Sequence, residues 1–251
     1  MKYGVVVFMA AASISSRAAG GQTIAGRVNA VSDGIVLMRF AATPGVCGDG
    51  SGSMWTSQRS MQMSSRDSRV CMNGPIRVSV GRADNATVSV RVFVGGAWRP
   101  GATDTDLGVV SSVEAARYLI GVARSIGGRS GSDAVSAAAL ADSATITAEL
   151  AQLVRDGDAA LETRRQALYW LGETDIPTKE LAAVYEALRP VALRQHFTYV
   201  VSQRRDDVAV DKLIDIAQHD PDLEVRKQAM YWLGQTQNPK ALKFLRDLIT
   251  R

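Results

Sequence analysis

The chain has 251 residues and a net charge of +4, with 46% hydrophobic and 22% charged residues. This composition excludes a disordered chain and is typical of a globular protein with one large or two modest domains. The sequence contains no block of like charges, which argues against a nucleic-acid partner.

The N-terminus has the order of segments found in a secretory signal peptide. Lys2 precedes an apolar run over residues 4–14, and small residues follow up to Gly20. The run is too short to span a bilayer permanently. We therefore expect residues 1–20 to be a signal peptide and the mature protein to be periplasmic or secreted, with no stable membrane span. The alternative is a buried strand over residues 3–8.

The two cysteines, Cys47 and Cys71, are predicted to form a disulfide. A pair of this kind usually closes in an oxidising compartment, so the export signal and the even cysteine count support each other. The bond would close a loop of about 25 residues and contribute about 3 kcal/mol by the chain-entropy model.

Residues 22–98 show the alternation of apolar and polar residues that is typical of strands. The runs 23–31 and 35–40 flank an Asp-Gly turn signal, and the runs 75–80 and 87–94 flank a turn at 83–85. Such pairs predict hairpins of a half-buried antiparallel sheet. We therefore predict a small, disulfide-tied antiparallel β-domain over residues 22–98.

The long 48–70 loop of this region allows two chemical interpretations. Asp49 and Ser51 superficially resemble the nucleophile segment of trypsin-like proteases, but the histidines, His196 and His219, lie far downstream, and a serine nucleophile needs a base within reach. Thioethers also favour copper(I), although loop methionines more often pack as gap-fillers. The methionines in question are Met54, Met61, Met63 and Met72. The simplest interpretation is a surface loop tethered by the disulfide.

Residues 99–110 have the Gly, Asp and Thr content of a linker, and helical spacing follows from 111 to the end. Ser111 and Glu114 form a capping-box signature, which predicts a first helix that caps the region. Asp220-Pro221 and Asn238-Pro239 place cap-type residues before helix-opening prolines, and Gly172 and Gly234 are predicted to end their helices. Further helices are predicted near 133–141, 145–155, 160–172, 178–188, 190–203, 207–218, 222–234 and 239–249.

A motif occurs twice in this helical region. The sequence Arg-Arg-Gln-Ala-Leu-Tyr-Trp-Leu-Gly begins at Arg164, and Arg-Lys-Gln-Ala-Met-Tyr-Trp-Leu-Gly begins at Arg226, 62 residues later. An offset of this length contains two helix pairs, so residues 111–251 are expected to stack about four pairs behind the capping helix. The predicted fold class is α+β with two domains: a small antiparallel β-domain followed by an all-α solenoid.

The segment Asp-Pro-Asp-Leu-Glu-Val-Arg over 220–226, with Leu233-Gly234 and Asn238-Pro239, resembles the short bacterial HEAT repeat of phycobilisome-lyase-related proteins. The resemblance implies an α-solenoid that binds proteins, and an arginine at position 226 that braces neighbouring loops. Some members bind iron through His-Glu pairs, which this chain lacks, so that activity does not carry over.

The repeated helices offer one candidate surface. Val225, Ala229, Trp232 and Leu233 fall on one face, which predicts a core, whereas Gln166, Tyr169, Gln228 and Tyr231 fall on another. Exposed tyrosines suit interfaces, so these four residues are the predicted partner-binding site. The alternative is a solvated face whose tyrosines pack on the adjacent repeat.

The sequence thus predicts an exported, non-enzymatic protein-interaction scaffold with no catalytic residues, no metal site and no cofactor. The alternative is an envelope enzyme, an enzyme accessory or a methionine-based metal-binding protein that uses the 48–70 loop. The oligomeric state is left open.

Overall fold

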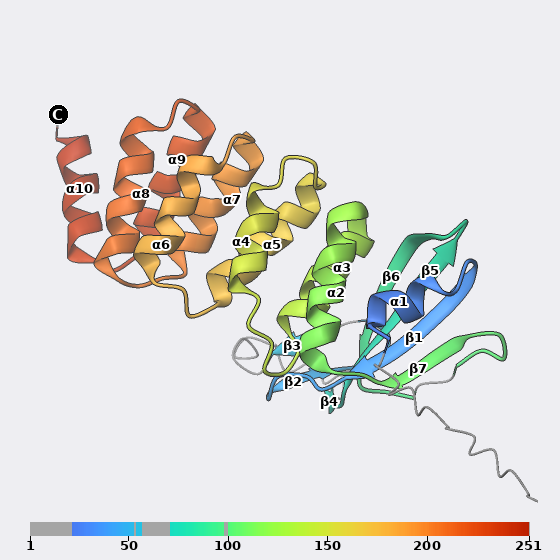
Figure 1. Cartoon of the computed structure of the whole chain (residues 1–251). Helices are drawn as coiled ribbons and strands as arrows, with labels where there is room; N and C mark the ends of the chain where they lie inside the picture. The colour runs from blue at the N-terminus through green and yellow to red at the C-terminus, as the bar shows by residue number, and fades with distance from the viewer. Residues whose placement is uncertain (1–21, 53, 57–70, 98–99, 251) are drawn as a thin grey trace, which may run out of the picture.

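The computed structural model describes residues 22–52, 54–56, 71–97 and 100–250 (Figure 1). The expected signal peptide, and residues 53 and 57–70 of the 48–70 loop, lie outside these ranges. The chain folds as α+β, with a sheet region at its N-terminal end and helices from residue 112 onward.

The main sheet has four strands in the order β6-β5-β1-β7. β1 (Gly34–Phe40), β5 (Ile76–Ala83) and β6 (Ala86–Val94) are antiparallel neighbours, as predicted. β7 (Thr105–Val109) instead pairs parallel to β1, so the prediction of a purely antiparallel sheet is wrong. This strand lies in the segment 99–110 that was expected to be a linker.

One face of the sheet is a continuous apolar surface. Alternate residues of the three antiparallel strands stand opposite one another, and all are at most 4% exposed. They are Val36, Met38, Phe40, Ile76, Val78, Val80, Val90, Val92 and Val94. The predicted turn between β5 and β6 is confirmed, because Asp84 and Asn85 both adopt the positive φ that a two-residue hairpin turn requires.

The predicted strand over 23–31 is wrong, because residues Ile24–Asn29 form the short helix α1. The Thr23 hydroxyl caps this helix by accepting from the Gly26 amide at 3.1 Å. Ile24 and Val28, four residues apart, are both buried. The Ile24 amide donates to Glu114 Oε1 at 2.6 Å, so the carboxylate that was expected to complete a capping box at Ser111 binds α1 instead.

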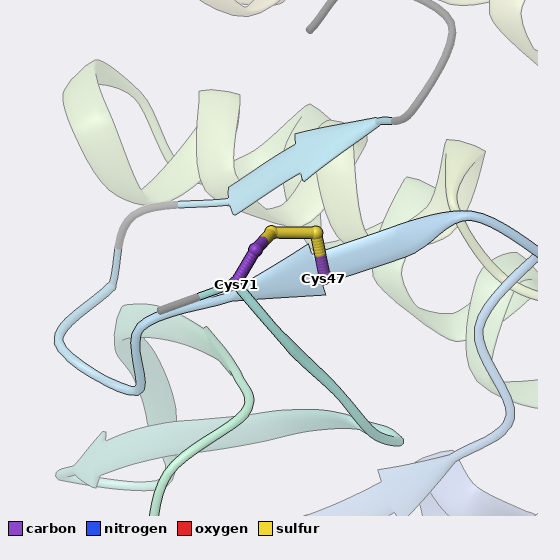
Figure 2. Close-up of a disulfide and its surroundings, with 2 residues drawn as sticks. All are labelled: Cys47 and Cys71. Carbon is purple, nitrogen blue, oxygen red and sulfur yellow. A yellow bond between two sulfur atoms is a disulfide. The ribbon is translucent and has the colours of Figure 1, made fainter. Parts of the chain in front are cut away.

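The cysteines lie in a second, three-stranded sheet of order β3-β2-β4. Its strands are β2 (Val46–Gly48), β3 (Met54–Thr56) and β4 (Met72–Asn73). The Cys47–Cys71 disulfide joins β2 to the residue that precedes β4, with the two Cα atoms 5.3 Å apart (Figure 2). This confirms the predicted pairing.

The helices are α2 (Ser112–Ser125), α3 (Gly128–Ala139), α4 (Thr147–Arg155), α5 (Leu161–Glu173), α6 (Thr178–Ala183), the 3-10 helix η2 (Val184–Ala187), α7 (Val191–Ser202), α8 (Asp207–His219), α9 (Leu223–Gln235) and α10 (Pro239–Ile249). Most helices follow the predicted boundaries closely, but α3 begins at Gly128 instead of 133, and the predicted helix 178–188 is divided into α6 and the 3-10 helix η2. Asn238 caps α10 as predicted, since its side chain accepts from the Lys240 amide at 2.9 Å.

Three of the predicted helix-end signals need correction. Gly172 and Gly234 lie inside the last turns of α5 and α9, and Thr174 and Thr236 are the C-caps. The N-cap of α9 is Asp222, which accepts from the Glu224 and Val225 amides, whereas Asp220 is buried and has other partners.

Successive helices alternate between two layers. α3, α5, α7 and α9 contact one another in that order, and α8 lies between α6 and α10 in the second layer. Figure 1 shows this arrangement extending from the sheet to α10, with α2 and α3 next to the sheet. One apolar core runs through the whole assembly.

Backbone hydrogen bonds join the sheet region to the first helices. Ala42 forms an antiparallel bridge with Ala141 in the α3–α4 loop. The Thr43 amide donates to the Leu140 carbonyl and the Asp142 amide to the Ala41 carbonyl, each at 2.9 Å. α3 also packs against β6.

Candidate functional site

The four predicted partner-binding residues do not share one exposed stripe. Gln166 Nε2 donates to Ser136 Oγ of α3 at 2.9 Å, so this amide serves the contact between helices. Tyr169 and Gln228 are half-buried, and Tyr231 is 55% exposed. A binding role for these residues stays a prediction, and Tyr231 is the member that a partner reaches most readily.

Trp232, which was expected to be core, and the equivalent Trp170 are only partly buried and pack at the edge of the core. Trp170 Nε1 donates to Ser136 Oγ at 3.3 Å. Trp232 packs its ring 5.3 Å from that of Tyr199 in α7. Its Nε1 is buried and has no hydrogen-bond partner among the residues that the structure describes.

Each tryptophan lines a groove. The groove is formed by loops that connect a helix of one layer to a helix of the other. The terminal groove, of about 600 Å³, is formed by Ser202, Gln203, Arg204, Arg205, Val210, Trp232, Gln235, Thr236, Gln237 and Asn238. The junction groove, of about 580 Å³, is formed by the loops 43–46, 139–147 and 173–180 together with Leu150 and Trp170. Residues of the sheet region therefore form one wall of the junction groove.

The grooves are equivalent in the repeat but differ in charge. Trp170 and Thr174 of the junction groove correspond to Trp232 and Thr236 of the terminal groove, 62 residues later in each case. The junction groove is lined by Glu173, Asp175 and Glu180, whereas Arg204 and Arg205 line the terminal groove. Arg204 Nη2 also donates to the Thr174 carbonyl at 2.6 Å, which fixes the loop between the grooves.

The sequence did not predict the buried carboxylate Asp220, which is 5% exposed. It accepts from Arg194 Nε at 2.9 Å, from the Tyr185 hydroxyl, and from the Asp222 amide at 2.8 Å. Burial, and then the hydrogen bond and charge of Asp220, raise the pKa of Tyr185 well above its ordinary value. These bonds join the α8–α9 turn to η2 and α7, so Asp220 has a structural role.

Arg226 of α9 braces the α8–α9 turn, as expected for position 226, and the equivalent Arg164 of α5 contacts the last turn of α4. Arg226 Nη1 donates to the Asp220 carbonyl at 2.6 Å. The equivalent Arg164 donates from Nε to the Val154 carbonyl at 3.0 Å.

The two histidines lie on different helices, His196 in α7 and His219 in α8. His196 is half-buried in α7, and its pKa is lowered by burial and by the charge of Arg165. His219 is exposed, with Nδ1 3.0 Å from Asp215 Oδ1. Among the described residues, no group of three or more His, Cys, Asp or Glu side chains is placed to hold a metal ion.

Comparisons with known proteins found no matching family model, no similar curated protein and no similar solved structure. Within the described ranges, no helix has both the length and the apolar character needed to cross a membrane.

Proposed function

We propose that the chain is an exported, non-enzymatic protein-interaction scaffold, in which HEAT-like helix pairs present a partner-binding edge. The observation that carries the proposal is the pair of equivalent grooves, each lined by a tryptophan of the repeated motif and each within the size range of ligand sites. A partner that contacts both grooves has to be long, which favours a polypeptide over a small molecule.

The spacing of the grooves supports an extended segment of polypeptide. Packed helices lie about 8–10 Å apart, so α5 and α9, separated by α7, are about 20 Å apart. At about 3.3 Å per residue, some six residues of extended chain cover that distance. The acidic lining of the junction groove favours a basic side chain there, and Arg204 and Arg205 favour an acidic one in the terminal groove.

Export is supported by the disulfide, because such bonds persist in oxidising compartments. The order of charged, apolar and small residues over 1–20 supports it independently. Cell fractionation of C-terminally tagged protein is expected to find a shortened chain outside the cytoplasm. An uncleaved chain in the cytoplasm would contradict export.

Substitutions that change the charge of the groove rims test the binding edge. Asp175→Lys with Glu180→Lys alters the junction groove, and Arg205→Glu with Gln237→Glu alters the terminal groove; all four residues are exposed. The control, Arg155→Glu with Asp158→Lys, reverses two exposed charges near the α4–α5 loop, at the opposite ends of the helices, and leaves the net charge unchanged.

The measurement is quantitative mass spectrometry of proteins captured from envelope extract, with circular dichroism to confirm that each variant is folded. We expect each groove variant to retain less than a tenth of the partner that the natural chain captures, and the control to retain all of it. Equal capture by all folded variants would remove the grooves as the binding edge.

A further inference from the structure

The side of α9 that points away from α7 corresponds in sequence to the side of α5 that carries Gly172 and faces α7. Glu162, Arg165, Leu168, Tyr169 and Gly172 of α5 correspond to Glu224, Lys227, Met230, Tyr231 and Gly234 of α9. The ion pair within each set is also preserved, at 3.1 Å between Arg165 and Glu162 and at 2.8 Å between Lys227 and Glu224.

On α5, this surface is covered by α7. Gly172 leaves room for Val200, because a β-carbon at position 172 would lie closer than 3.0 Å to Val200 Cγ1. His196, one turn before Val200, lies next to Arg165, whose charge lowers the pKa of the imidazole. Arg204, which follows the C-cap of α7, donates to the Thr174 carbonyl. The contact therefore uses three positions of the covering chain, each four residues apart.

On α9, the same surface is open. A β-carbon at Gly234 would meet no described atom within 4 Å. Tyr231 is 55% exposed and Leu223 is 53% exposed. Gly234 lies away from the terminal groove side of α9, because the equivalent Gly172 faces α7 whereas Trp170 faces α3.

We propose that this side of α9 is a docking site for an amphipathic helix of a partner protein that resembles α7. The partner helix places a β-branched aliphatic side chain over Gly234 and an arginine, four residues later, at the Thr236 carbonyl. The α5–α7 contact defines this occupant, since it shows within the same molecule what fits against a surface of this composition.

A second copy of the chain is a poorer occupant, because its own α7 is engaged. Phe197 and Val201 are fully buried and Val200 is 3% exposed, so α7 does not leave the helical layer without disrupting the core. Glycine at a helix contact also has a specific effect, since it lets a bulky side chain approach the backbone closely. An α7-like helix of another protein is free to bind, and it can bring a bulky side chain close to the backbone at Gly234.

The test uses a fluorescent peptide that copies residues 190–205, with Gln195→Glu and Tyr199→Lys joined by a lactam. Tyr199 packs on Trp232, so this bridge lies on the side of the peptide away from Val200. It also reduces the nucleation cost that keeps short peptides unfolded. Fluorescence anisotropy with the intact chain measures binding.

We expect saturable binding that weakens at least tenfold when the chain carries Gly234→Leu, a change that leaves the fold intact because the site is open. The peptide with Val200→Asp is the matched control, and it is expected to lose binding to the same extent. Absence of saturable binding, or equal binding to Gly234→Leu, would overturn the proposal. A dimer in analytical ultracentrifugation that Gly234→Leu abolishes would also overturn it, by assigning the surface to a second copy.

Discussion

Gly172 and Gly234 occupy equivalent positions, but only Gly172 packs against α7. Substituting each by alanine therefore separates the packing energy of the α5–α7 contact from the helix propensity of the substituted residue. Alanine is favoured over glycine inside a helix by about 0.5–1 kcal/mol. Gly234→Ala is expected to gain this amount, because its β-carbon meets no described atom within 4 Å. Gly172→Ala gains the same propensity but places its β-carbon closer than 3.0 Å to Val200 Cγ1.

This clash is not easily relieved. Apolar carbons prefer separations of about 3.5–4.0 Å, and a valine side chain is stiff at χ1, so α5 and α7 have to separate. Overpacking of this kind costs about 1–3 kcal/mol. Because the propensity gain is common to both variants, their free energies of unfolding should differ by about 1–3 kcal/mol, with Gly172→Ala the less stable.

Urea denaturation followed by far-ultraviolet circular dichroism measures this difference. Val200→Ala serves as the control, since the double variant Gly172→Ala with Val200→Ala removes the clash. This double variant should be more stable than the sum of the two single effects predicts. The reasoning is refuted if Gly172→Ala is as stable as Gly234→Ala.

Two further predictions concern the histidine and the disulfide. The pKa of His196 in the folded chain lies below the ordinary value of 6.5. Between the folded and unfolded pKa values, the unfolded chain therefore binds more protons than the folded chain. The contribution of His196 to stability consequently declines as pH falls below 6.5. His196→Gln should therefore reduce the fall in Tm on acidification. Equal slopes of Tm against pH in the natural chain and in this variant would contradict this. Cys47→Ser with Cys71→Ser, which opens a loop with a sequence separation of 24, is expected to lower the free energy of unfolding by about 3 kcal/mol. Coincident denaturation curves for the natural chain and this variant would show that the bond adds no stability.

Local signals predicted the helices well because capping is a local interaction. Asn238 with Pro239 marks the start of α10, and the structure has the expected bond from the Lys240 amide. The strand at 23–31 was mispredicted because Ile24 and Val28 fit both an alternating pattern and helical spacing. A distant carboxylate, Glu114, completes α1 and favours the helix.

Long-range pairing explains the other differences. The Asp106-Leu107-Gly108 stretch has the composition of a turn, and Gly108 does adopt a positive φ, yet its pairing with β1 makes it part of a strand. The sequence predicts a helix end at Gly172. In the structure, glycine is needed there because Val200, 28 residues later in the sequence, leaves no room for a β-carbon. The grooves were missed because each is assembled from several loops, and only their tryptophans carried a signal.

Because hydrogen bonds join residues 41–43 to residues 140–142, we expect the two ends of the chain to tolerate truncation differently. The sheet closes one end of the helical layers, so a fragment that begins at residue 111 exposes the side of α3 that packs on β6. Shortening from the other end removes α9 and α10 without touching the sheet. For expression of a stable part of this protein, we therefore expect cuts to be better tolerated near the C-terminal end than at the segment between the sheet and α2.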